Sequence, residues 1–300
     1  MNVDLSQGDA LALYEYAKRL LREHPDGPLP GQGLPLPDHD TYYRQPVPNS
    51  RAREAGAARI GAAVGAYFGG GADYADLCQT LVSVFCPPWH ELISVLEPAI
   101  SGVEFGRVLA LGRRLTRTGT DRRPVQVGLV LLQGVAEAED VDCISALAIL
   151  GNSFSPSVVE ILKRMPDPDT TLWWIARRTT AWARVYPVEA LCRTTTDPAI
   201  KAWLLRHSVT DDPLSGYYAG EVAVSCDLRG ALEVPEPDEA LLDGAEAILH
   251  AMDRAGGMGP GLEHYHDAVP VLRRFLQFRE SPPLRAALAR LPPGPRDASP

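Results

Sequence analysis

The sequence has few lysines and no long apolar run. Only three of its 29 basic residues are lysine, and this bias toward arginine is typical of GC-rich bacterial genomes. No stretch approaches the roughly 18 consecutive apolar residues that a membrane-spanning helix needs. The N-terminus also lacks the basic and then apolar segments of a secretion signal. We therefore expect a bacterial, cytoplasmic protein with no segment in a membrane.

Cysteines are scarce and unpaired in the sequence. The chain has five of them, an odd number, and no two form a CxxC motif. A disulfide scaffold usually has an even number of cysteines, and many zinc sites contain CxxC pairs. The pattern predicts reduced thiols that pack as small hydrophobic side chains, and it gives no sign of a bound metal or cofactor. The cysteines are Cys78, Cys86, Cys143, Cys192 and Cys226.

Positive charge is in the minority, since the net charge is -9. A protein that coats nucleic acid does so by neutralising phosphates, so this charge disfavours non-specific binding of that kind. Two local clusters of arginine remain. We interpret them as solvated helix faces and helix ends, and the alternative is that they line one DNA-binding groove. The clusters are Arg113, Arg114, Arg117, Arg122 and Arg123, and then Arg177, Arg178 and Arg184.

Strand patterns are absent as well. No segment alternates strictly between apolar and polar residues with β-branched enrichment, so we predict no sheet. From residue 50 onward, apolar segments of helical period are broken at short intervals by glycine or proline, which predicts helices that pack antiparallel on their chain neighbours. In the first part of this region the predicted helices lie within 51–68, 72–85, 90–100, 104–117, 123–135 and 141–150.

The N-terminal part has a different composition. A helix is predicted from a cap at Ser6, with Asp9 in a capping-box position, to about residue 23. Residues 25–48 then contain seven prolines and three glycines, which predicts an extended loop without a helix.

These patterns predict three regions along the chain. Residues 1–49 form an N-terminal helix and an extended loop. Residues 50–291 form an α-helical repeat domain, and residues 292–300 form a disordered tail.

Two segments in the middle of the chain repeat at a spacing of 30 residues. Each contains an Asp-Pro pair, a tryptophan six positions after the aspartate and a valine nine positions before it. An aspartate before a proline is a strong helix start, because the carboxylate caps the helix and the proline fits its first turn. The period predicts stacked helical hairpins. The repeats contain Asp167-Pro168, Trp173 and Val158, then Asp197-Pro198, Trp203 and Val188, and a third pair follows at Asp212-Pro213.

Residues 157–182 and 187–208, which contain these repeats, resemble HEAT-like repeats. The resemblance implies an all-α fold, a right-handed α-solenoid of stacked antiparallel hairpins that covers about residues 104–225. The sequence departs from the family pattern after the turn, where Trp173 and Trp203 stand near the usual place of an arginine. By this resemblance we expect a protein-interaction module that binds a protein partner on its concave surface. The oligomeric state is not predicted.

One stripe of side chains is the leading candidate for a binding site. Trp174, Arg178 and Trp182 follow each other at intervals of four, so they form one stripe on a helix. Arginine stacks well between indole rings. The alternative is that the stripe is core packing. The candidate binding residues are Trp174, Arg178, Trp182, Arg113, Arg114 and Arg117.

HEAT-like repeats also occur in bacterial DNA glycosylases that act on alkylated bases. This resemblance implies that Asp167 or Asp169 supplies a carboxylate, while Trp174, Trp182 and Arg178 contact DNA. Helix capping is a sufficient explanation for Asp167 by itself, so we assign no catalytic residue.

A third hypothesis is a metal-dependent helical enzyme. His264 and His266, with Glu263 and Asp267, form one dense group of metal-ligating residue types. Acidic groups resemble the magnesium ligands of helical isoprenoid cyclases, but the dense aspartate-rich box of those enzymes is missing. The acidic groups are Asp73 with Asp76, and Glu137, Glu139, Asp140 and Asp142.

Overall fold

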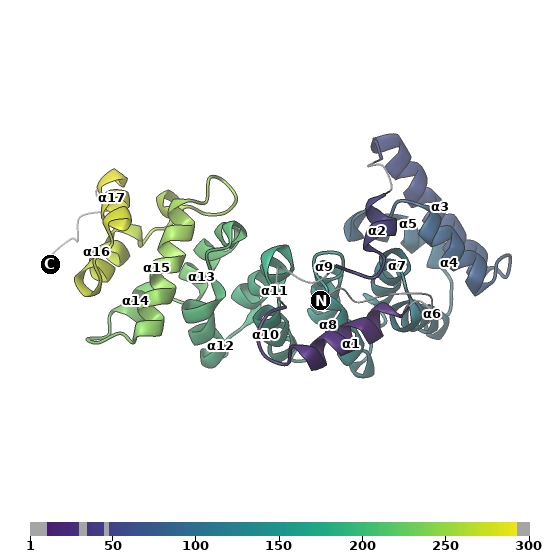
Figure 1. Cartoon of the computed structure of the whole chain (residues 1–300), viewed down its shortest axis with the longest axis horizontal. Coiled ribbons are helices and arrows are strands. Elements are labelled where there is room, and N and C mark those ends of the chain that lie inside the picture. The colour runs from purple at the N-terminus through teal and green to yellow at the C-terminus, as the bar shows by residue number, and fades with distance from the viewer. Residues whose placement is uncertain (1–10, 30–34, 45–47, 293–300) are drawn as a thin grey trace. The chain divides into compact units, whose positions relative to one another are not determined.

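A computed structural model describes residues 11–29, 35–44 and 48–292 (Figure 1). Its regular elements are helices, and no β-strand occurs within these ranges, so the predicted all-α class is confirmed. Among the described helices, none combines the length and the apolarity needed to cross a bilayer. The chain divides into two compact units, Met1–Thr171 and Leu172–Pro300.

Unit 1 begins with α1 and continues to α9, and α10 spans the boundary between the units. The predicted helices of residues 51–150 are all present, with ends shifted by a few residues. The elements are α1 (Leu13–Glu23), α2 (His39–Tyr43), α3 (Ser50–Phe68), α4 (Tyr74–Ser83), α5 (Trp89–Ile100), α6 (Phe105–Thr118), α7 (Arg122–Leu132), η2 (Ala138–Asp140), α8 (Val141–Ala148), α9 (Ser155–Leu162) and α10 (Pro168–Arg178).

The most extensive helix–helix contact of unit 1 is between α6 and α7. Glycines allow this approach, since a Cβ on Gly128 would lie 2.8 Å from the Cβ of Leu115. Helix α3 packs on both α4 and α5, while α7 contacts α4, α5 and α9. Some chain neighbours therefore pack on each other, as α3 with α4 and α6 with α7 do, while other contacts join helices that are not consecutive. The solenoid and its handedness stay predictions. The buried side chains at the centre include Leu77, Leu81, Leu92 and Leu111.

Helix α1 packs against α6 and α8, and so belongs to the core of unit 1 (Figure 1). Its side chains Leu13, Ala17 and Leu20 are buried, and the Leu13 amide donates a hydrogen bond of 2.8 Å to the Gly119 carbonyl. The predicted cap residues Ser6 and Asp9 lie outside the described residues. So do residues 293–300 of the predicted tail.

The expectation of a helix-free loop over residues 25–48 was wrong at α2. Residues 38–45 contain no proline, so the backbone there can form helical turns. The segment is also held from outside, because the Asp38 carboxylate accepts hydrogen bonds of 2.9 Å from the guanidinium and the backbone amide of Arg122. Both side chains are buried.

Unit 2 contains shorter and less regular helices. The long helix α15 lies at its centre and contacts η3, η4, α13, α16 and α17. Besides the last turns of α10, the elements are α11 (Ala181–Thr194), α12 (Pro198–Trp203), η3 (Leu204–Ser208), η4 (Pro213–Tyr217), α13 (Ala219–Ser225), α14 (Leu228–Leu232), α15 (Glu239–Asp253), η5 (Leu262–His264), α16 (Ala268–Phe278) and α17 (Pro282–Arg290).

The Asp-Pro pairs mark helix starts as predicted. Helix α10 begins at Pro168, α12 begins at Pro198, and the 3₁₀ helix η4 begins at Pro213. The Asp197 carboxylate accepts a hydrogen bond of 2.7 Å from the amide of Ala199, and Asp212 caps η4 in the same way. The equivalent tryptophans of the two repeats, Trp173 and Trp203, contact each other edge to face with ring centroids 6.3 Å apart.

Gly244 allows a very close approach of α15 to the π-helix η3. Gly244 of α15 faces the Leu205 carbonyl oxygen of η3 so closely that no Cβ fits between them. The last carbonyl of η3, on Ser208, accepts a hydrogen bond of 3.0 Å from the Tyr218 hydroxyl and one of 3.4 Å from Arg184. These donors hold the backbone of η3 in place against α15.

Arginines connect helices that lie about one hairpin apart in the sequence. Each pair joins a guanidinium to an oxygen 27 to 38 residues away. Pairs with exposed partners contribute little stability singly, and they mainly fix the register of neighbouring helices. In unit 1 the pairs are Arg113 with Asp140 and Arg164 with the Gln133 carbonyl; in unit 2 they are Arg193 with Glu221, Arg206 with Asp238, Arg229 with Asp267, Arg279 with Asp243 and Arg290 with Asp253.

Candidate functional site

A surface on unit 2 gathers aromatic, acidic and apolar side chains from two helices. Four residues of α11 follow at intervals of four, three and four, so they lie on one face of the helix. These are Trp182, Tyr186, Glu189 and Arg193. The opposite side is formed by Tyr217 of η4 and by α13, which packs against α11. We call this region, with Cys192, Glu221, Val224 and Ser225, the α11–α13 surface.

Aromatic rings form one end of the α11–α13 surface. The ring centroid of Trp182 lies 4.7 Å from that of Tyr217 and 6.4 Å from that of Tyr186. Trp182 is 36% exposed, although an indole is usually well buried. About a third of this residue is therefore open to solvent, and aromatic rings attract cations.

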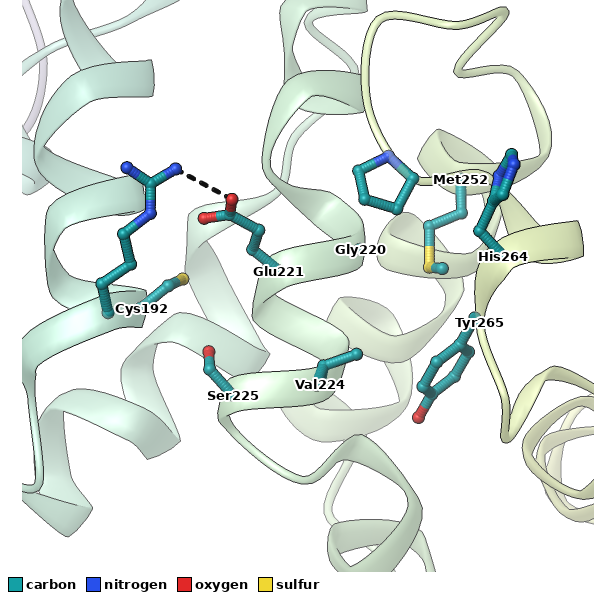
Figure 2. A pocket seen from close by; sticks show the side chains of 10 residues that line it. Cys192, Gly220, Glu221, Val224, Ser225, Met252, His264 and Tyr265 are labelled. Atoms are coloured by element: carbon teal, nitrogen blue, oxygen red, sulfur yellow. Dashed lines mark hydrogen bonds and ion pairs between the residues drawn. The ribbon is translucent and has the colours of Figure 1, made fainter.

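A cavity of about 330 Å³ lies at the other end (Figure 2). Helix α13 supplies one wall, with Gly220 and Val224 in one row and Glu221 and Ser225 in the next. Figure 2 shows Glu221 and Ser225 on the side that faces α11, and Val224 directed toward Tyr265. The complete lining is Cys192, Arg193, Gly220, Glu221, Val224, Ser225, Met252, Pro260, His264 and Tyr265.

The lining is mostly apolar and is open at Val224. This side chain is 66% exposed, the highest value among the exposed large hydrophobic side chains of the described residues. Gly220 is required beside it, because a Cβ there would lie 2.8 Å from the Pro260 carbonyl oxygen. The absence of a side chain at Gly220 thus lets the loop before η5 approach α13 and form the second wall of the cavity.

The charged groups of the surface carry an excess of carboxylate. Arg193 lies 2.9 Å from an oxygen of Glu221 and 3.6 Å from one of Glu189. The second oxygen of Glu221, Oε2, is buried and accepts no hydrogen bond from any described residue. One guanidinium therefore faces two carboxylates, and Glu221 keeps one acceptor oxygen that no described residue uses.

Burial, and then the neighbouring Glu221, raise the pKa of Glu189 above its ordinary value of 4.5, while Arg193 lowers it. Because the folded state binds this proton more tightly, the resulting stability is present below the ordinary pKa and is lost as the pH rises through the higher folded pKa. We expect Glu189→Gln to raise the free energy of unfolding at about pH 7 and to change it little at about pH 4.

Urea denaturation of the full chain at both pH values measures this effect. The matched control is Glu236→Gln, which removes a carboxylate from an exposed turn of the same unit. A gain at Glu189 that is equal at both pH values, or equal to that of the control, would contradict the assignment of a buried carboxylate.

The predicted stripe of Trp174, Arg178 and Trp182 is not continuous. Helix α10 ends at Arg178, and α11 starts at Ala181, whose φ of 50° is left-handed. The turn at Thr179 and Thr180 breaks the four-residue period, so the expectation of one helical face was wrong. The Arg178 guanidinium does lie over the Trp174 ring, at 4.4 Å, whereas Trp182 contacts the tyrosines described above.

The predicted arginines of unit 1 lie among carboxylates and a tyrosine. Arg113 contacts Glu137 and Glu139 at 2.6 Å each and Asp140 at 2.8 Å. Arg117 contacts Asp140 at 3.1 Å, and Arg114 stacks 3.6 Å over the Tyr74 ring. Burial raises the pKa of Asp140, but the hydrogen bonds from Arg113 and the Glu137 amide outweigh it, so this pKa is lowered.

Four of the six acidic residues considered as magnesium ligands act in helix capping. Asp73 and Asp76 form a reciprocal capping box at the start of α4, with hydrogen bonds of 2.9 and 3.2 Å. Glu137 and Asp140 form another at η2. In these capping boxes the carboxylates accept hydrogen bonds from backbone amides.

The two histidines do not converge on one ion. His264 pairs with Glu263 at 3.1 Å and His266 with Asp267 at 3.5 Å. Within the described part of the chain, no group of three or more histidine, cysteine or acidic side chains is arranged to hold a metal.

Several residues of the α11–α13 surface were not identified from the sequence. The spacing of Trp182, Tyr186, Glu189 and Arg193 was a visible signal, but it was obscured by placing Trp182 on the helix before. No sequence signal marks Val224 or Glu221, because their role depends on how α13 packs against α11 and the loop before η5.

Comparison of the chain with family models, with curated proteins and with solved structures finds no match. The resemblance to HEAT-like repeats therefore stays a prediction from the residues that carry it.

Proposed function

We propose that this chain is a protein-interaction module that binds a basic, amphipathic segment of a protein partner on the α11–α13 surface. The observation that carries the proposal is Val224, an apolar side chain 66% exposed at a cavity whose edge has an excess of carboxylate. An apolar side chain of the partner fills the cavity next to Val224, and its flanking lysine or arginine reaches Glu221.

The composition of the surface supports this partner chemistry. Clusters of aromatic and apolar side chains bounded by charged groups are typical of binding hot spots. Trp182, which is 36% exposed, and the adjacent Tyr217 provide aromatic rings that can attract a second cation of the partner. The chain's net charge of -9 further favours association with a basic segment.

DNA binding has less support. The arginines predicted to line a groove already contact carboxylates or rings, as Arg113, Arg114 and Arg117 do. A phosphate would have to displace these partners, so the net gain from each contact is small. We therefore do not propose a glycosylase or another DNA-binding function.

A peptide-display experiment tests the proposal. A random peptide library is selected on the full chain, and the enriched peptides are synthesised with a fluorophore. We expect apolar residues flanked by lysine or arginine, and affinity that falls with added salt because the charges are partly exposed. Val224→Arg should weaken binding by about tenfold or more, since it blocks the cavity and repels a basic ligand.

The matched control is Val234→Arg, which adds the same charge at a 44% exposed valine outside the cavity. It should leave peptide affinity unchanged, and both variants should retain the melting temperature of the parent chain. Enrichment of acidic peptides, or an equal loss of peptide affinity in both variants, would refute the proposal. Salt-sensitive binding of a fluorescent DNA duplex that competes with the peptides would favour the nucleic-acid alternative instead.

A further inference from the structure

Three aromatic side chains are gathered at one end of the α11–α13 surface. They belong to Trp182, Tyr186 and Tyr217, and we call them the aromatic cluster. The ring centroid of Trp182 lies 4.7 Å from that of Tyr217 and 6.4 Å from that of Tyr186. Both distances are those of rings in direct contact, so a ligand of the cluster lies on its outer surface, where Trp182 is 36% exposed.

The charge beside the aromatic cluster is negative. Glu189 follows Tyr186 by one turn of α11. Burial raises the pKa of Tyr186, and the Glu189 carboxylate and then Tyr217 raise it further. Arg193 is held between Glu189 and Glu221, at 3.6 and 2.9 Å. Because the two carboxylates exceed this guanidinium by one charge, the surface next to the rings attracts a cation.

Other aromatic rings of this chain already have a cation over them. The Arg114 guanidinium lies 3.6 Å from the ring centroid of Tyr74, and the Arg178 guanidinium lies 4.4 Å from that of Trp174. By contrast, no lysine or arginine among the described residues lies over a ring of the aromatic cluster. The attraction of these rings for a cation is therefore available to a ligand.

The shape of the cluster favours arginine over lysine as that ligand. A guanidinium is planar and more weakly hydrated than an ammonium, so it stacks on an aromatic ring at a smaller loss of hydration. A lysine ammonium is a compact, strongly hydrated charge without a flat face. Since the ligand lies on the outside of the packed rings, a flat cation makes the larger contact with them.

We propose that the aromatic cluster is an arginine-binding subsite, on which a guanidinium of the partner segment stacks beside the Glu189 carboxylate. The inference rests on the proposed function, because it identifies the second cation of the same partner as arginine. The rings and Glu189 lie at the opposite end of the surface from the cavity, so the subsite also binds a free arginine derivative weakly.

The test uses the full chain labelled with 5-fluorotryptophan and three probes, which are the amides of N-acetylarginine, N-acetyllysine and N-acetylcitrulline. Fluorine NMR follows the five tryptophans, and Trp182→Phe assigns the Trp182 signal by removing it. We expect the arginine amide to shift this signal with an apparent affinity about threefold or more above that of the lysine amide. Citrulline is planar but uncharged, so its amide should have little effect.

Trp174 is a control in the same spectrum, because Arg178 already lies over its ring. Its signal, assigned with Trp174→Phe, should not respond to the arginine amide. Glu189→Gln should weaken the Trp182 response to this probe, whereas Glu236→Gln, on an exposed turn, should not. No shift at Trp182, an equal response to the arginine and lysine amides, or equal responses at Trp174 and Trp182 would overturn the proposal.

Failure of the subsite and failure of the proposed function give different results. Selected peptides may depend on Val224 for binding and yet keep their affinity when every arginine is replaced by lysine. That result would support the proposed function and overturn the arginine subsite. An arginine-selective shift at Trp182, without enrichment of basic amphipathic peptides, would support the subsite and overturn the proposed function.

Discussion

Replacement of Asp38 by alanine is expected to lower the free energy of unfolding of unit 1 by about 3 to 5 kcal/mol. The Asp38 carboxylate binds Arg122 through Nε and Nη2 at 2.9 Å each, and the two side chains are only 4% and 5% exposed. Removal of the carboxylate leaves a buried guanidinium without its counterion, which costs far more than the loss of an exposed pair. Urea denaturation measures the loss of stability, and hydrogen exchange shows which helices are destabilised.

The control for this prediction lies on the same short helix. Asp40 is exposed and 3.9 Å from Arg44, so Asp40→Ala should change stability by no more than about 0.5 kcal/mol. Hydrogen exchange should increase in α2 and in the first turn of α7 for Asp38→Ala alone. Similar losses of unfolding free energy in the two variants would show that the buried pair does not hold residues 35–44 to unit 1.

Gly244→Ala is expected to destabilise unit 2 by about 1 to 3 kcal/mol or more. The added Cβ overlaps the Leu205 carbonyl oxygen, which belongs to the backbone of η3. That carbonyl has little freedom to move, because the end of η3 is held by Tyr218 and Arg184. Helix α15 must therefore shift away from η3 and lose packing. Urea denaturation of the variant measures the cost.

Gly65→Ala is the matched control, since Gly65 also lies inside a helix but has no atom within 4 Å of the position that an added Cβ would take. There the substitution should stabilise the chain by about 0.5 to 1 kcal/mol, because alanine has the higher helix propensity. If Gly244→Ala were also stabilising, the close approach of α15 and η3 would be disproved.

Local patterns in the sequence determined the helix content and several helix boundaries. The starts at Pro198 and Pro213 follow from the preceding aspartates, whose carboxylates reach amides two or three residues away. The period of the apolar residues placed α3 to α8 within a few positions. These features are predictable because both partners of each interaction lie within one helical turn.

Contacts between distant residues were decided by the tertiary structure. Asp38 and Arg122 are 84 residues apart, and no local pattern marks them as partners. The repeated tryptophans Trp173 and Trp203 were visible in the sequence, but their contact with each other was not. Arg113 and Arg117, which were candidates for a basic groove, likewise pair with Asp140, 27 and 23 residues away, and no local pattern marks that partner.

The candidate site also combines features that the sequence shows with contacts that only the fold creates. Trp182 was identified from the sequence, but the left-handed backbone at Ala181 starts a new helix and turns this side chain toward Tyr217. The cavity beside Val224 depends on the packing of α13 against α11. The sequence alone determined that the chain is helical and where many helices begin, because those interactions are local. Only the tertiary structure decided which side chains meet at the site, because they come from separate helices.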